Sequence, residues 1–205
     1  MIGGWDTPPR PIDPFGPPGS TGPVRHETVE LIGPHLRVSG EISLLHFSRL
    51  SDLINHSRGY VKVVGAQILR RNGDPTGQVI QELMVNQDEI TFIAQTEANI
   101  SPSDTGSASP MDRPLMKRVP RELVIFTEGH TLTGLIHLFA ETEIDAFVDS
   151  GDPRFVPMTD VTARWLSDRR VVCKFGLVLV NRTQMLAAAL REKAGTADET
   201  GVSIE

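Results

Sequence analysis

The sequence predicts a mainly β protein of the α+β class, made of two tandem homologous modules. Each module is expected to be a bent antiparallel sheet or small open barrel with one short helix. The segment VSGEISL at 38–44 returns in outline as LTGLIHL at 132–138. Residues 171–177 place an apolar side chain at every second position, which is the period of a strand. A repeat at a fixed spacing indicates a duplicated supersecondary unit.

The two copies align with one insertion. A shift of 94 residues matches Gly40 with Gly134, and one extra residue near Pro153 changes the shift to 95, which matches Tyr60 with Phe155. Apolar spacing and loop positions survive although few residues are identical. An ancestral catalytic site would therefore be expected at matching positions in both copies.

Composition divides the chain into five segments. Residues 1–26 contain seven prolines and five glycines, which favours a disordered Pro/Gly-rich tail because proline lacks a backbone donor and little apolar surface is available. The first β module is expected at 27–96, a polar linker at 97–119, the second β module at 120–194 and a disordered tail at 195–205.

The first module begins with a short strand and a longer one, followed by a helix and further strands. Glycine inside the longer strand predicts a bulge or bend, at Gly40 here and at Gly134 in the second module. In the helix, Leu50, Leu53 and Ile54 share one face. The strands are expected at 28–32, 36–45, 60–70, 79–86 and 89–94, with the helix at 48–55.

The second module repeats this succession up to its end. Thr142 is expected to cap its helix, which carries Ile144, Phe147 and Val148 on one face. The run MLAAAL predicts a further helix at 183–193, since these residues favour helices. The strands are expected at 122–126, 131–139, 155–166 and 171–180.

Two asparagines, Asn86 and Asn181, close the last long strand of each module, where asparagine tolerates the left-handed conformation of a corner. A module of about 65 residues is marginally stable alone, so we expect the two to pack face to face as a pseudo-twofold pair.

Charge and cysteine usage limit the function classes. The net charge of −6 argues against a general nucleic-acid-binding role, because such proteins need a basic face. Cys173 is the single cysteine, which fits a reducing compartment, and we expect a cytoplasmic location. No apolar run is long enough for a membrane span, and no signal peptide is recognised.

Motif searches predict no catalytic residues, no metal site and no cofactor. The sequence lacks GxxxxGK[ST], GxGxxG, HExxH, CxxC and GxSxG patterns. No histidine is shared between the copies, and neither is a carboxylate pair.

Basic residues are the candidate ligand-binding groups, and two aromatic residues are the candidate partner-docking groups. PilZ-type barrels bind cyclic dinucleotides through spaced arginines and a D/NxSxxG segment, which Asp74 to Gly77 does not reproduce. The ligand candidates are Arg70, Arg71, Arg164, Arg169 and Arg170, and the docking candidates are Trp5 and Phe15.

The string RLSDLIN at 49–55, followed by YVKV at 60–63, resembles small bacterial domains of uncharacterised function. The resemblance covers about 36–93 and, more weakly, 130–186. It implies module boundaries and carries over no chemistry.

The function expected from these features is a non-enzymatic scaffold or regulatory protein that binds other proteins, with a homo-oligomer as one form. A small-ligand or nucleotide sensor is the alternative, and an enzyme with one site in the inter-module cleft is the second alternative.

Overall fold

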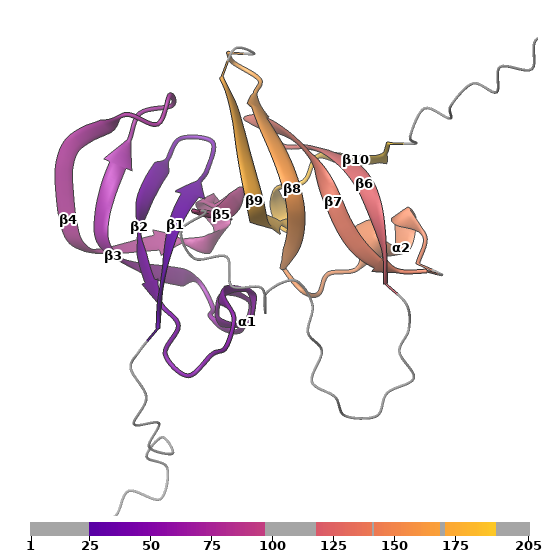
Figure 1. Ribbon diagram of the computed structural model, residues 1–205, viewed down its shortest axis with the longest axis horizontal. Coiled ribbons are helices and arrows are strands. Elements are labelled where there is room, and N and C mark those ends of the chain that lie inside the picture. The colour runs from indigo at the N-terminus through magenta and orange to yellow at the C-terminus, as the bar shows by residue number, and fades with distance from the viewer. Residues whose placement is uncertain (1–24, 97–117, 141, 169–170, 192–205) are drawn as a thin grey trace, which may run out of the picture.

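The computed structural model describes residues 25–96, 118–140, 142–168 and 171–191 (Figure 1). The predictions for the first 24 residues, for most of the linker and for 195–205 lie outside these ranges. So do Trp5, Phe15, Arg169 and Arg170.

The protein is mainly β, and the described residues form ten strands in one open antiparallel sheet in the order β10-β6-β7-β8-β9-β5-β1-β2-β3-β4. The first half contains β1 (His26–Ile32), β2 (Arg37–Ser43), α1 (Leu50–His56), β3 (Tyr60–Leu69), β4 (Pro75–Asn86), the 3-10 turn η1 (Gln87–Glu89) and β5 (Phe92–Gln95). The second half contains β6 (Arg118–Phe126), β7 (His130–Phe139), α2 (Ile144–Asp149), β8 (Phe155–Trp165), β9 (Val172–Asn181), η4 (Arg182–Gln184) and β10 (Ala187–Leu190).

The two halves share strand register as well as element order. Val29 pairs with Gly40 between β1 and β2, and Leu123 pairs with Gly134 between β6 and β7. The ladders β2–β3 and β7–β8 both change register at that glycine. A Cβ on Gly40 would lie 2.5 Å from Val63 Cγ1, so the close approach of the neighbouring strand requires glycine. The predicted bulge is therefore present in both halves.

In both halves, a side chain that follows the asparagine donates a hydrogen bond to a carbonyl group near the C-terminus of the helix. Gln87 follows Asn86 and donates through Nε2 to the carbonyl oxygen of Ile54, 3.1 Å away in α1. Arg182 follows Asn181 and donates through Nη1 to the carbonyl oxygen of Phe147, 2.6 Å away in α2. Both donors thus satisfy carbonyl groups that a helix leaves free near its C-terminus.

The halves lie side by side in the sheet, so the expected face-to-face packing is wrong (Figure 1). β5 pairs antiparallel with β9, placing Phe92 opposite Val180 and Ala94 opposite Val178. The physical reason is that both strands otherwise have an open backbone edge, whose donors and acceptors are satisfied only by another strand.

This β5–β9 seam is buried on both faces because the two hydrophobic cores lie on opposite sides of it. Ile93 and Leu179 contribute to the first core, together with Phe155. Their neighbours Phe92 and Val180 contribute to the second core. Alternation along a strand sends successive side chains to opposite faces, so each half completes the core of the other.

The predicted helix at 183–193 is wrong, because η4 is followed there by the strand β10. Ala187 pairs with Phe126 and Leu190 with Leu123, which completes the open side of β6. Tertiary pairing overrides the modest helix preference of alanine and leucine.

Three smaller differences concern boundaries. The second half begins with Arg118 in β6, before the predicted boundary at 120. β4 begins at Pro75 and is longer than expected. The residue at the N-cap of α2 is Glu143 and not Thr142, and its side chain makes no capping hydrogen bond. Neither helix of the described residues has the length and apolar character needed to cross a bilayer.

Candidate functional site

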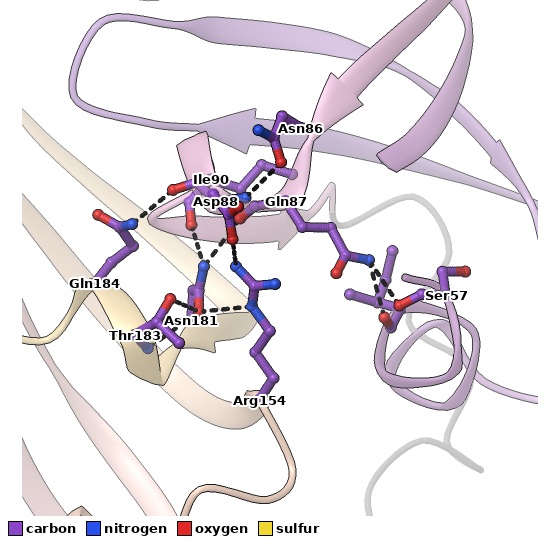
Figure 2. Close-up of polar contacts among 10 residues, drawn as sticks. Ser57, Asn86, Gln87, Asp88, Ile90, Arg154, Asn181, Thr183 and Gln184 are labelled. Carbon is purple, nitrogen blue, oxygen red and sulfur yellow. Dashed lines mark hydrogen bonds and ion pairs between the residues drawn. The ribbon is translucent and has the colours of Figure 1, made fainter. Parts of the chain in front are cut away.

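Two groups of polar side chains stand out where the halves meet. The first, called the seam cluster, comprises Asn55, Gln87, Asp88, Arg154, Asn181 and Gln184. It lies at one end of the β5–β9 ladder, and Figure 2 shows most of its members. The second lines a hollow formed by the β1–β2 turn, the β3–β4 turn and the end of β8.

Asn181 is the centre of the seam cluster. Its side chain is fully buried, and Nδ2 donates to the carbonyl oxygens of Gln87, at 3.0 Å, and Ile90, at 2.8 Å (Figure 2). Its Oδ1 accepts from the Thr183 amide at 3.1 Å and from the Thr183 hydroxyl at 2.8 Å. The amide is saturated and ties η1 of the first half to the end of β9.

The two asparagines act through their side chains, so the expected left-handed backbone is wrong. Asn86 has φ −66° and Asn181 has φ −78°, which are ordinary values. Each Oδ1 accepts from the amide two residues later, Asp88 or Thr183. Asparagine favours such turns because its short side chain reaches the backbone.

Two further side chains cross the seam at the surface. Arg154 forms an ion pair with Asp88, and Gln184 Nε2 donates to the Asp88 carbonyl oxygen at 2.6 Å. The Asp88 carboxylate is largely exposed, so we expect the ion pair to add about 0–1 kcal/mol to stability.

Asn55 joins the helix of the first half to the second half. Its Nδ2 donates to the Phe155 carbonyl oxygen at 2.9 Å, and its Oδ1 accepts from the Phe155 amide at 2.7 Å. A side-chain amide thus satisfies both backbone groups at the start of β8. Every polar contact of the seam cluster described above holds one segment of the chain against another. No member of the cluster provides a nucleophile paired with a base.

The hollow has a volume of about 170 Å³ and is lined in part by His35, Arg37, Arg71 and Trp165. Arg37 is buried, and its Nε and Nη2 donate to Glu30 Oε2 at 3.0 and 2.8 Å. Its Nη1 donates to the Arg71 carbonyl oxygen at 2.8 Å, and its guanidinium lies 5.2 Å from the Trp165 ring centroid. Arg37 therefore links β1, the β3–β4 turn and β8.

Of the predicted ligand residues that the structure describes, Arg71 alone lines this hollow. Its Nη1 donates to Ser167 Oγ at 3.1 Å. Arg70 and Arg164 are exposed and do not line the hollow. Arg169 and Arg170 lie outside the described residues, so the ligand-binding role of the candidate arginines stays a prediction.

His130 lies close to the hollow and is buried between aromatic rings. Its ring centroid is 4.7 Å from that of Trp165 and 5.4 Å from that of Phe92. The pKa of His130 is lowered from 6.5 to about 4, chiefly by burial and in addition by the charges of Arg37 and Arg71. Neither ring nitrogen has a hydrogen-bond partner among the described residues. The imidazole is therefore neutral near pH 7.

Sequence reasoning missed Asn55, Arg37 and Asn181 as the residues that join the halves. The sequence indicates the position of Asn181, because Asn86 matches it at the end of the last long strand. The expected role was a left-handed backbone, whereas the observed role is hydrogen bonding by the side chain. Arg37 gave no signal, because its importance depends on partners in distant segments.

A broader, shallow depression near α2 is lined by residues that include Arg121, Glu143 and Leu190. In the described part of the chain, no three His, Cys, Asp or Glu side chains lie close enough to hold a metal ion.

Comparisons with protein-family models, curated proteins and solved structures return no significant match for this chain. The fold and the two sites therefore carry the functional argument.

Proposed function

We propose that this protein is a non-enzymatic scaffold or regulatory binding protein, built by duplication of one β module. The observation that carries the proposal is the β5–β9 seam. It joins two similar halves through backbone pairing and leaves β4 and β10 as the outer strands of the sheet.

The duplication is supported by register. The pairs Val29 with Gly40 and Leu123 with Gly134 are separated by the same shift of 94 residues that the sequences show. The pairs Tyr60 with Asn86 and Phe155 with Asn181 differ by 95. If the two sheets were unrelated, their pairings would not be expected to change shift from 94 to 95 at the same insertion that the sequences show.

A binding role is supported by the two outer strands. An open strand edge presents unpaired N–H and C=O groups to which another chain can add a strand. Apolar side chains near both edges are exposed, including Met84 on β4 and Leu190 on β10. By contrast, the seam strands are buried on both faces, so the seam leaves little room for a substrate.

Affinity capture from the cells that encode the protein, followed by native mass spectrometry, tests this function. We expect a stoichiometric protein complex, either with itself or with another protein, that is lost when Met84→Lys places a charge at the exposed apolar position of β4. Absence of any stoichiometric complex in wild-type protein would contradict the scaffold role.

The hollow around Arg37 and Arg71 supports a second candidate, a sensor of small anions. Its volume of about 170 Å³ is below the roughly 300–1,000 Å³ of sites for drug-sized ligands, so phosphate fits better than a dinucleotide. Thermal shift with phosphate and a nucleotide panel tests it, because a ligand that binds the folded state raises the Tm. Arg71→Ala should abolish any such rise, and no rise with any ligand of the panel excludes those ligands.

The enzyme alternative has less support. The place expected for an inter-module cleft is occupied by the β5–β9 ladder and by side chains of the two cores.

A further inference from the structure

We propose that β10 of one copy pairs antiparallel with β4 of a second copy and thereby reproduces the β5–β9 seam between molecules. The expected register is Ala187 opposite Val85, Ala188 opposite Met84 and Ala189 opposite Leu83. The proposal rests on the duplication and scaffold role above, and it specifies the partner as a second copy of this chain.

The order of strands in the sheet supports this pairing. In the first half the order is β5-β1-β2-β3-β4, and in the second half it is β10-β6-β7-β8-β9. The seam therefore joins the fifth strand of one half to the fourth strand of the other. β10 is the remaining fifth strand and β4 the remaining fourth strand, and they lie at opposite ends of the sheet. The two strand edges needed for a second seam, those of β10 and β4, are thus present. They lie too far apart to pair within one molecule.

Apolar side chains of β4 and of its neighbour β3 are exposed. Met84 is 57% exposed, whereas the equivalent Leu179 in the seam is 2% exposed. Tyr60 is 57% exposed, whereas the equivalent Phe155 is 0% exposed. Leu179 and Phe155 fill the core of the adjoining half. Met84 and Tyr60 are therefore apolar groups in positions where the same fold buries them.

The same contrast occurs at the other edge. Leu186, which precedes β10, is 73% exposed, whereas the equivalent Thr91 is 1% exposed. Phe126 on β6 is also exposed, and its equivalent Ile32 is buried in the core of the adjoining half. Exposed apolar residues gathered at both outer edges are typical of an interaction surface.

Asn86, the equivalent of Asn181, lies at the open edge of β4. Asn86 Oδ1 accepts from the Asp88 amide at 3.0 Å, as Asn181 Oδ1 does from the Thr183 amide (Figure 2). The Nδ2 of Asn181 donates across the seam to Gln87 and Ile90. Within the described part of the chain, the side-chain hydrogen bond of Asn86 is the one that its Oδ1 accepts, and its Nδ2 donates to no group there. Opposite β10 of another copy it would face the carbonyl oxygens of Arg182 and Met185, the equivalents of Gln87 and Ile90.

The directions of the backbone N–H groups at both edges fit this pairing. Gln87 N donates to Gly59 O on the β3 side, and N–H groups alternate between the two neighbours of an antiparallel strand. The amides of Asn86 and Met84 therefore face the open side of β4. By the same alternation, the Arg191 amide donates to Glu122 of the β6 segment, so the Ala188 and Leu190 amides face the open side of β10.

Three seam contacts would not be reproduced. Glu89 stands at the position equivalent to Gln184 and Asp149 at that equivalent to Asn55, and a carboxylate cannot donate to a carbonyl oxygen as these side-chain amides do. Gly59 stands at the position equivalent to Arg154, and Thr183 at that equivalent to Asp88, so the ion pair has no counterpart. We therefore expect the contact between copies to be weaker than the internal seam and to depend on protein concentration. Because the contact joins two different surfaces, repetition gives a closed ring or an open filament.

Two proline variants test the pairing in the full chain. Met84→Pro and Ala188→Pro each remove one outward-facing amide and leave the ladder to the inner neighbour intact. In sedimentation velocity over a concentration series, wild-type protein should self-associate and each variant alone should be monomeric. An equal mixture should form a dimer of one variant with the other, since together they retain one intact β10 edge and one intact β4 edge.

Lysine variants serve if a proline variant does not fold. Met84→Lys should abolish assembly because its seam equivalent Leu179 is buried. Val79→Lys is the matched control on the same strand, since its equivalent Lys174 is already an exposed lysine, and it should assemble like wild type.

The proposal would be overturned if wild-type protein were monomeric at every concentration, or if either proline variant self-associated alone. It would also be overturned if the mixture of the two proline variants stayed monomeric, or if both lysine variants disrupted assembly equally. A monomeric wild type whose capture of a different protein is lost in Met84→Lys would leave the scaffold function standing and reject only the second copy as the partner.

Discussion

The side chain of Asn181, at the end of β9, donates to the carbonyl oxygen of Gln87 in the other half of the chain at 3.0 Å, in a fully buried position. This contact joins two segments that the sequence separates widely. Asn181 can be compared with Asn86, which occupies the equivalent position of the first half at the open edge of β4.

Removal of the Asn181 amide should destabilise the protein strongly. Asn181→Ala leaves the carbonyl oxygens of Gln87 and Ile90 buried without their donor and removes the turn contact to Thr183. An unsatisfied buried polar group costs about 1–3 kcal/mol, so we expect a loss of about 2–4 kcal/mol in the free energy of unfolding, measured by urea denaturation. Asn86→Ala, compared in dilute protein, should cost about 1 kcal/mol or less. Equal losses in the two variants would contradict the assigned role.

The glycines of the two bulges should be intolerant of alanine. A Cβ on Gly40 would lie 2.5 Å from Val63 Cγ1, and one on Gly134 would lie 2.8 Å from the Thr159 carbonyl oxygen. Such overpacking costs about 1–3 kcal/mol, which thermal or chemical denaturation would detect. Gly151→Ala is the control, because no atom lies within 4 Å of the added Cβ, and its effect should stay within about 0.5 kcal/mol. A neutral Gly40→Ala would show that β3 can move away.

His130 should make stability depend on pH. Its pKa is lowered from 6.5 to about 4 in the folded protein, chiefly by burial. Between pH 6.5 and about 4 the unfolded chain therefore binds a proton that the folded chain does not. The free energy of unfolding falls as pH is lowered through this window, by about 3 kcal/mol over its full width.

Denaturation at pH 7.5, 6 and 5 measures the slope. His130→Phe keeps an aromatic ring between Trp165 and Phe92 and removes the titrating group, so its stability should change less over this range. Parallel curves for the two proteins would assign the pH dependence to other groups.

Arg37 should influence both stability and the titration of His130. Arg37→Gln removes the buried pairing with Glu30 and weakens the link to the Arg71 carbonyl, which should cost about 1–3 kcal/mol. Loss of its charge should also raise the pKa of His130, since repulsion from Arg37 lowers that pKa in the wild type. NMR titration of the imidazole reports this change. Arg37→Lys should retain the lowered pKa but recover little stability, because lysine lacks the fork that contacts Glu30 and Arg71 together.

Much of the fold was predictable because its signals are local. Alternation of apolar residues, the glycine within the long strand and the helical face of Leu50, Leu53 and Ile54 depend on residues close in sequence. The candidate site was only partly predictable. Arg71 was found as a basic residue in a turn, whereas Arg37 acquires its role only when Glu30, Arg71 and Trp165 converge on it.

The sequence by itself determined the mainly β class, the repeated order of elements and the positions where the backbone must bend, since these follow from side-chain period and from glycine. Only the tertiary structure decided that Ala187 to Leu190 form a strand and that β5 pairs with β9. The physical reason is that strand pairing satisfies backbone groups, which are the same in every residue. The choice of partner therefore depends on which edges remain open once the local elements have packed.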